Sequence, residues 1–119
     1  MMNATELIAR ARQLLHAPNH ATRFVWALAA THLARQAIES AMHHLWHLRR
    51  VPGLSDANMR NQLVALPFYV SDRALAGRVA WVWSALSEAG HDRGLEHAPT
   101  ATDLGAWLTV VEGFIVMTG

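Results

Sequence analysis

The chain contains no cysteine and no lysine, and it has few charged residues of any kind. Without cysteine, disulfide bonds, thiolate metal ligands and cysteine nucleophiles are excluded. All ten cations are arginines and stand against nine carboxylates, so the formal net charge of +1 gives no general attraction to nucleic acid. Charged residues make up 16% of the 119 positions and hydrophobic residues 52%, which is enough apolar material for a core.

The sequence also lacks a recognisable targeting or membrane segment. Its first residues include no basic region followed by an apolar run, so we expect no signal peptide and a cytoplasmic protein. The apolar stretch at residues 107–117 is interrupted by Glu112 and is shorter than the ~18 residues of a membrane span, so we expect no membrane association. A mean hydropathy of +0.11 is high for so short a chain. Because a small domain cannot bury all its apolar surface alone, we expect a homodimer.

Apolar residues recur at helical spacing, and no alternation typical of strands occurs. Residues 21–50 pass without proline or glycine and predict one helix about 45 Å long, at ~1.5 Å per residue. The shorter helices must then pack along this one. The pattern predicts an all-α antiparallel bundle that forms a single domain over residues 1–119. It has four main helices plus one short helix and is built on the long second helix.

Polar residues and helix breakers set the expected ends of the shorter helices. Two capping boxes are predicted, one formed by Asn3 with Glu6 and the other by Thr100 with Asp103. The short third helix is expected at about residues 56–66 and the fourth at about 72–89. The remaining expected signals are Pro18 as a stop, Asn19, Ser55 and Ser71 as starting caps, and Gly90 as a closing cap.

Eight histidines are many for this length, and His43 and His47 lie one turn apart in the long predicted helix. Both imidazoles can face one metal ion, and His32 or Glu39 on nearly the same face could add a ligand. The glutamate of a zincin helix is absent, and the Glu39–His43 spacing of four differs from the three of diiron bundles. We therefore expect no cofactor, with a divalent-metal site as the alternative to a solvated helix face.

Arg60 and the tryptophans are candidates for ligand contacts. Arg60, beside Asn61 in the short predicted helix, could hold a phosphate or carboxylate through two parallel hydrogen bonds. An ordinary surface turn is the alternative. The five tryptophans fall within predicted helices and are expected mostly in the core. Trp46 and Trp83 are the candidates for an aromatic ligand pocket.

Ser87 and His91 also lie one turn apart, at the end of the fourth predicted helix. A nucleophilic serine needs an orienting carboxylate and an oxyanion hole, and neither can be identified, so we do not expect a hydrolytic triad. His91 and His97 stay candidates for general acid–base catalysis. A capping or loop histidine is the alternative.

Three segments follow one another in an order that resembles a known family. They are Met-Arg-Asn at 59–61, Trp-Ser-Ala-Leu-Ser-Glu-Ala-Gly-His at 83–91, and Ala-Pro-Thr at 98–100 followed by an amphipathic stretch at 103–111. This order resembles the HEPN-like helical domains (higher eukaryotes and prokaryotes nucleotide-binding), in particular small bacterial members of unknown function. The resemblance covers about residues 4–116.

Active HEPN proteins are typically dimeric, metal-independent ribonucleases or toxins. Their motif begins with arginine, often followed by asparagine, and ends with a histidine a few positions later. Arg60 and Asn61 match its start, whereas Ala65, Leu66 and Pro67 stand where the histidine would fall. The family's acid–base partner is therefore missing.

The resemblance implies a non-catalytic, dimeric binding or interaction module with a protein or small-molecule partner. Two alternatives stay open. One is a small-ligand or metal-binding bundle, with or without enzymatic activity, that uses the His43 and His47 face. The other is a residual ribonuclease that uses Arg60 and an unconventional histidine such as His91. Basic and aromatic residues do not interleave on one stretch, so nucleic-acid binding has no strong local signature.

Overall fold

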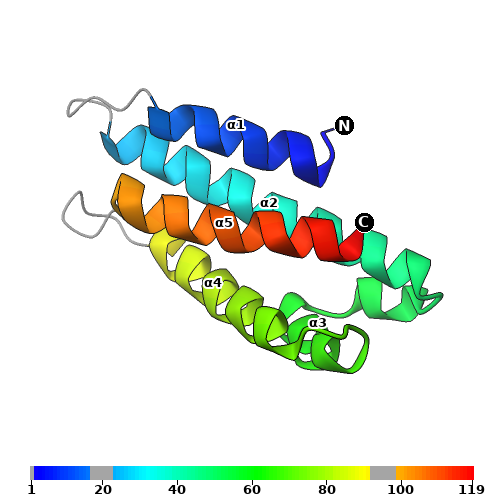
Figure 1. Cartoon of the computed structure of the whole chain (residues 1–119). Helices are drawn as coiled ribbons and strands as arrows, with labels where there is room; N and C mark the ends of the chain where they lie inside the picture. The colour runs from blue at the N-terminus through cyan, green and yellow to red at the C-terminus, as the bar shows by residue number, and fades with distance from the viewer. Residues whose placement is uncertain (1, 17–22, 92–98) are drawn as a thin grey trace.

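The computed structural model describes residues 2–16, 23–91 and 99–119, and within these ranges every regular element is a helix (Figure 1). The molecule measures 46 × 25 × 23 Å along its principal axes. The α-helices are α1 (Ala4–His16), α2 (Arg23–Leu48), the short α3 (Met59–Ala65), α4 (Arg73–His91) and α5 (Ala101–Thr118), with 3-10 turns η2 (Pro52–Asp56) and η3 (Leu66–Phe68) on the two sides of α3. The predicted all-α architecture is confirmed.

The long helix α2 is the centre of the packing. It contacts α1, α4 and α5, and α5 contacts α1 and α4 in turn. Figure 1 shows α5 lying between α1 and α4, while α3 and its two 3-10 turns lie at the end of the molecule where α4 begins. The prediction of a bundle built on the second helix is therefore confirmed.

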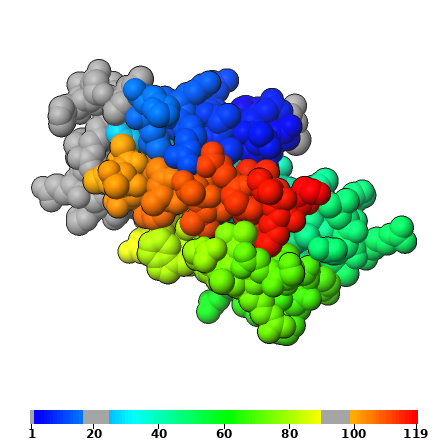
Figure 2. Space-filling model, in the orientation of Figure 1, coloured from blue at the N-terminus to red at the C-terminus, as the bar shows by residue number. Residues whose placement is uncertain are grey.

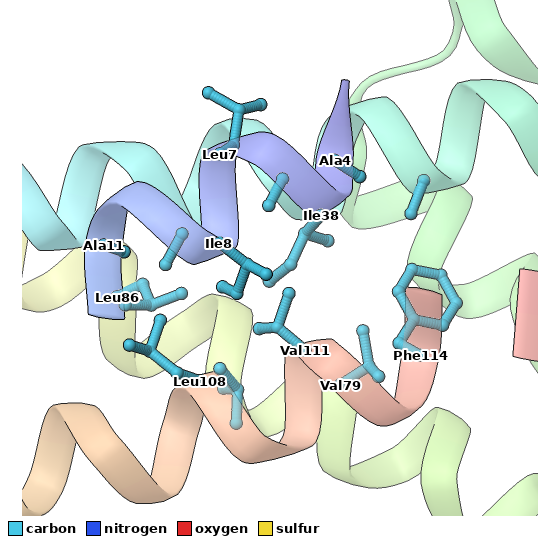
Figure 3. Packing of buried hydrophobic residues seen from close by; sticks show 14 of the residues in the cluster. Ala4, Leu7, Ile8, Ala11, Ile38, Val79, Leu86, Leu108, Val111 and Phe114 are labelled. Carbon is cyan, nitrogen blue, oxygen red and sulfur yellow. The ribbon is translucent and has the colours of Figure 1, made fainter. Parts of the chain in front are cut away.

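The core lies where the four long helices meet, and its side chains are almost entirely apolar. Alanines at positions 27, 30, 34, 37 and 41 of α2 are all buried, and their small side chains let neighbouring helices approach closely. Large aliphatic and aromatic side chains fill the remaining space, each contributing roughly 1.5–3 kcal/mol on burial. Figure 3 shows those from the other helices converging on this region, among them Ile8, Val79, Leu86, Leu108, Val111 and Phe114.

Both predicted capping boxes are present. The backbone N–H of Glu6 donates to Asn3 Oδ1 at 2.8 Å, and the Glu6 carboxylate accepts from the N–H of Asn3 at 3.4 Å. At the start of α5, Thr100 Oγ1 accepts from the N–H of Asp103 at 3.1 Å, and the Asp103 carboxylate accepts from the N–H of Thr100 at 3.3 Å. Each box satisfies two backbone donors at a helix start that have no partner within the helix.

Three other predicted boundaries are wrong: two helix starts and one helix end. Ser55 lies inside η2, because Pro52 starts a 3-10 turn there, and α3 is capped instead by Asn58, whose Oδ1 accepts from the N–H of Asn61 at 2.8 Å. At the start of α4 the cap is Asp72 rather than Ser71: its carboxylate accepts from the N–H of Leu75 at 2.9 Å.

The C-terminal end of α4 differs too, since this helix continues through Gly90 to His91. A glycine is tolerated near a helix end at a cost of about 1 kcal/mol relative to alanine, so its presence does not force a stop. The expected stop at Pro18, the cap Asn19 and the start of the long helix at residue 21 lie outside the described residues, as does His97.

Arginine occupies an unusual position just after α2. The N–H of Arg50 donates to the carbonyl of His47 at 3.2 Å, and the N–H of Val51 donates to the carbonyl of Trp46 at 3.0 Å. This pair of bonds is the Schellman motif, which requires a left-handed residue and favours glycine there. Arg50 has a φ of 59°, the one positive φ among the described non-glycine residues. The chain thus turns sharply towards η2 and α3 at some cost in backbone strain.

Candidate functional site

Trp46 and Gln62 hold the short helix α3 against α2. Trp46 is fully buried, and its Nε1 donates to Gln62 Oε1 at 2.9 Å. Gln62 Nε2 in turn donates to the carbonyl of Ala57 at 2.7 Å, and the ring of Tyr69 meets the indole edge-on at a centroid distance of 5.3 Å. The indole of Trp46 therefore has no exposed surface for a ligand and instead positions α3.

The α3–α4 groove is the open depression between α3 and α4, with a volume of about 570 Å³. This volume falls in the range of small-molecule sites, roughly 300–1,000 Å³. The groove brings together Arg60 and Trp83, two of the candidates from the sequence, although 22 residues separate them in the chain. Its lining consists of Arg60, Leu63 and Val64 from α3 and of Ala80, Trp83, Ser84 and Ser87 from α4.

The polar groups of the α3–α4 groove are donors without an acidic neighbour in the lining. Arg60 is exposed and forms no salt bridge with any described residue. The hydroxyls of Ser84 and Ser87 bond to no described residue, whereas those of Thr31, Thr109 and Thr118 donate to carbonyls of their own helices. The groove thus offers one guanidinium and two hydroxyls to an incoming group.

A second cation lies beside this groove. The guanidinium carbon of Arg35, from α2, lies 5.0 Å from the centroid of the Trp83 ring. Its Nε is buried and has no hydrogen-bond partner among the described residues. The cation–π contact fixes the Trp83 indole from the α2 side and adds positive charge to this part of the molecule.

Asn61 does not join Arg60 in the groove lining. The backbone of Asn61 is part of the α3 cap, and its side chain is exposed. His91 is the last residue of α4, one turn beyond Ser87, and its side chain lies outside the described part of the structure. Of the positions where a HEPN histidine would fall, Leu66 is fully buried in the core.

The histidine face of α2 lines a different depression. His32, His43, His47 and Glu39 are all exposed. Glu39 and His43 border the α1–α2 groove, a depression of about 580 Å³ that Met2, Leu7, Gln36 and Ser40 also line. Over residues 2–16, 23–91 and 99–119, no three His, Asp or Glu side chains approach closely enough to hold a metal ion. Protein zinc sites use three or four such ligands, so the predicted metal site gains no support.

The outer surface of α5 is open, and its exposed residues are Thr102, Asp103, Ala106, Thr109 and Val116. Figure 2 shows α5 exposed along its length between α1 and α4. By length and composition it is the one described helix that could cross a membrane, with a mean hydropathy of 1.2, yet only 28% of it is buried. A core helix of a soluble protein meets the same criteria. Val116 is 80% exposed, and the neighbouring Trp81 of α4 is 63% exposed and meets Trp107 edge-on at 6.3 Å.

No protein-family model, curated protein or solved structure matches the chain. The HEPN-like resemblance therefore rests on the residues alone.

Part of the α3–α4 groove was missed from the sequence. Leu63, Val64 and Ala80 were not singled out, although a usable signal was present. Arg60, Leu63 and Val64 have the spacing i, i+3, i+4, and residues 80, 83, 84 and 87 have the spacing i, i+3, i+4, i+7. Each set therefore forms one helix face with mixed chemistry. The sequence alone does not show that the α3 face and the α4 face lie against each other.

Proposed function

We propose that the protein is a non-catalytic helical binding module of HEPN-like organisation that works as a homodimer. The observation that carries this proposal is the exposed, uncharged surface of α5, which we call the α5 face: the exposed residues Thr102, Ala106, Thr109 and Val116, together with Trp81 of α4. Val116 and Trp81 expose large apolar side chains on and beside the most apolar helix of the bundle, and such exposure supports an interaction site.

A second copy of the chain is the partner that best fits the α5 face. A two-fold interface uses the same surface of both copies, so an unpaired charge on that surface would be buried twice. The residues of the α5 face are all uncharged, and the Arg12–Glu112 ion pair lies at its edge, where Arg12 donates to Thr109 Oγ1 at 2.9 Å. Its small side chains also allow two helices to approach closely. From Thr102 to Val116 the face is about 21 Å long at ~1.5 Å per residue.

The packing of α5 favours a protein partner over a lipid bilayer. The opposite side of this helix buries Leu104, Leu108, Val111 and Phe114 in the core. Its one carboxylate beyond the first turn, Glu112, is paired with Arg12 of α1 at 2.6 Å. Crossing a membrane would require α5 to give up both the core contacts and this ion pair.

The absence of a catalytic role is supported by the surroundings of Arg60. A HEPN ribonuclease needs a histidine within reach of the arginine, and the corresponding stretch carries Ala65, the buried Leu66 and Pro67. A histidine at position 66 would have to be buried in the core. The short helix α3 therefore carries the arginine of the motif, whereas the turn after it places the apolar Leu66 in the core where the motif would have a histidine.

Sedimentation velocity over a range of concentrations tests the dimer, with Val116→Glu as the disrupting variant and Val25→Glu as its control. Val25 lies on α2 and is 67% exposed, so the control places the same charge at a similarly exposed valine elsewhere. We expect the parent and Val25→Glu to have twice the mass of 13.2 kDa in sedimentation. Val116→Glu should have the monomer mass, because each copy would bury an unpaired carboxylate in the interface.

A parent protein that stays monomeric at every concentration would contradict the proposal, as would a dimer that Val116→Glu leaves intact. Flotation with phospholipid vesicles is run in parallel. If the parent floats with the vesicles and Val116→Glu does not, the α5 face binds membrane and the dimer proposal is wrong.

A further inference from the structure

We propose that the α3–α4 groove is a binding site for a small carboxylate with an apolar or aromatic body, held at its charged end by Arg60. This inference goes beyond dimerisation, because the groove lining and the α5 face share no residue. It rests on the charge, the shape and the unused donors of the groove.

The charge of the groove favours an anionic ligand. Among the described residues, the lining contains one cation, Arg60, and no carboxylate, and Arg35 places a second guanidinium against Trp83 from the α2 side. An exposed arginine without a salt-bridge partner among the described residues keeps all five guanidinium donors for a ligand. Anions are therefore attracted to this groove, whereas cations are repelled.

The geometry of the donors selects a carboxylate within that class. A guanidinium presents two parallel N–H groups that match the two oxygens of a planar carboxylate. On the facing wall, Ser84 and Ser87 are three residues apart on the same side of α4, and neither hydroxyl bonds to a described residue. Within the lining, one guanidinium and two hydroxyls suit a single negative charge, because Arg35 lies against the Trp83 ring and does not line the groove. Phosphate sites usually add helix N-terminal amides or a further cation that contacts the anion.

The remaining lining selects the body of the ligand. Leu63, Val64, Ala80 and Trp83 supply apolar surface, and Val64 is 67% exposed in the absence of a ligand. An apolar chain or ring laid along the groove would cover Val64 and meet the Trp83 indole. Small-molecule sites commonly combine such apolar walls with a few convergent polar groups. A volume of about 570 Å³ accommodates a ligand of roughly ten to twenty non-hydrogen atoms.

Isothermal titration calorimetry with 4-phenylbutyrate tests this assignment, beside two probes with the same phenyl body and a different head group. The neutral 4-phenylbutanol tests whether charge is required, and 4-phenylbutyl phosphate tests whether the site prefers a dianion. We expect saturable binding of the carboxylate at one site per chain, with at least about tenfold weaker binding of the alcohol, because a charge-assisted hydrogen bond is lost. The phosphate should bind no tighter than the carboxylate.

The variants separate the two ends of the ligand. Arg60→Gln should weaken carboxylate binding about tenfold or more and leave alcohol binding unchanged, whereas Val64→Ser should weaken both. Arg78→Gln is the matched control, since Arg78 is exposed on α4 outside the groove lining, and it should change neither. All three positions are exposed, so the variants keep the fold, which circular dichroism verifies.

Three results would overturn the inference: no saturable binding of 4-phenylbutyrate, equal binding to the parent and Arg60→Gln, or tighter binding of the phosphate than of the carboxylate. None of them bears on the dimer, whose mass is measured separately.

Discussion

Two depressions of the bundle have almost the same volume, about 580 Å³ for the α1–α2 groove and about 570 Å³ for the α3–α4 groove. Their chemistry differs. The first carries a carboxylate and an imidazole, Glu39 and His43, whereas the second carries the guanidinium of Arg60 with two serine hydroxyls. Volume alone therefore does not identify a binding site in this molecule. The two grooves differ in their charges and in the hydrogen-bond donors that have no partner among the described residues.

The two grooves are also built differently. The α1–α2 groove lies between two long helices that pack along much of their length. The α3–α4 groove depends on a helix of only seven residues, held by the Trp46–Gln62 hydrogen bond and by the contact of Trp46 with Tyr69. The wall that carries Arg60 therefore rests on a few contacts, which single substitutions can remove.

The largest expected effect comes from Trp46→Phe. This change removes the donor to the buried Gln62 Oε1 and leaves a small void, so we expect a loss of about 3 kcal/mol in the free energy of unfolding. Urea denaturation measures it. Hydrogen exchange should accelerate more in α3 than in α1, since α3 loses its anchor. The half-buried Trp83 is the control, and a Trp83→Phe variant that costs as much would contradict the role given to Trp46.

A smaller loss of stability is expected when the ion pair between α1 and α5 is removed. Arg12 donates to both Glu112 oxygens, at 2.6 and 3.3 Å, and also to Thr109 Oγ1 and the carbonyl of Gly105. Because its side chain is 30% exposed and that of Glu112 is 42% exposed, solvent screening reduces the value of the pair. We expect Arg12→Met to cost about 1 kcal/mol in urea denaturation, less in high salt.

The matched control is Arg10→Met, at an exposed position of the same helix with no salt bridge to a described residue. Arg12→Met should loosen the α1–α2 groove and leave the α3–α4 groove unchanged. An equal loss of stability in both arginine variants would show that the ion pair contributes nothing.

A change of opposite sign is expected at Arg50, where α2 turns towards α3. Glycine adopts a φ of 59° without a Cβ clash, so Arg50→Gly should raise the free energy of unfolding by about 0.5–1 kcal/mol. Arg49→Gly, one residue earlier, serves as the control and should not stabilise. A less stable Arg50→Gly protein would mean that the arginine side chain makes a compensating contact.

The smallest effect is expected from the histidines. Two exposed imidazoles one turn apart, without a third ligand among the described residues, should retain no stoichiometric metal. After exposure to zinc, iron or manganese and removal of the excess, elemental analysis should give the same low content for the parent and for the double variant His43→Ala/His47→Ala. About one metal per chain that the double variant loses would restore the metal-binding alternative.

Local patterns in the sequence predicted local structure well and tertiary neighbours poorly. The capping boxes at Asn3 and Thr100 were predictable because each needs only residues three apart. The cap of α3 is a different case: serine and asparagine are equally good caps, and the 3-10 turn starting at Pro52 makes Asn58 the cap in place of the predicted Ser55. For the same reason, helical spacing placed His43 and His47 on one face but could not supply a third ligand from another helix.

The candidate site shows the same limit. Arg60 and Trp83 were each recognisable as residues that contact ligands, but their meeting depends on how α3 folds back on α4. The Trp46–Gln62 hydrogen bond fixes that fold-back, and it joins residues 16 positions apart. No periodic pattern in the sequence encodes such a contact, so the groove can be identified only from the way the helices pack in the structure.

The most direct test of the choice between the two grooves is a ¹H–¹⁵N NMR titration of the parent protein with 4-phenylbutyrate. The account predicts saturable shifts of the amides of Arg60, Val64 and Ser84 and of the Trp83 indole N–H, with those of Gln36, Ser40 and His43 unchanged. Shifts confined to the second group would place the anion in the α1–α2 groove and contradict the account.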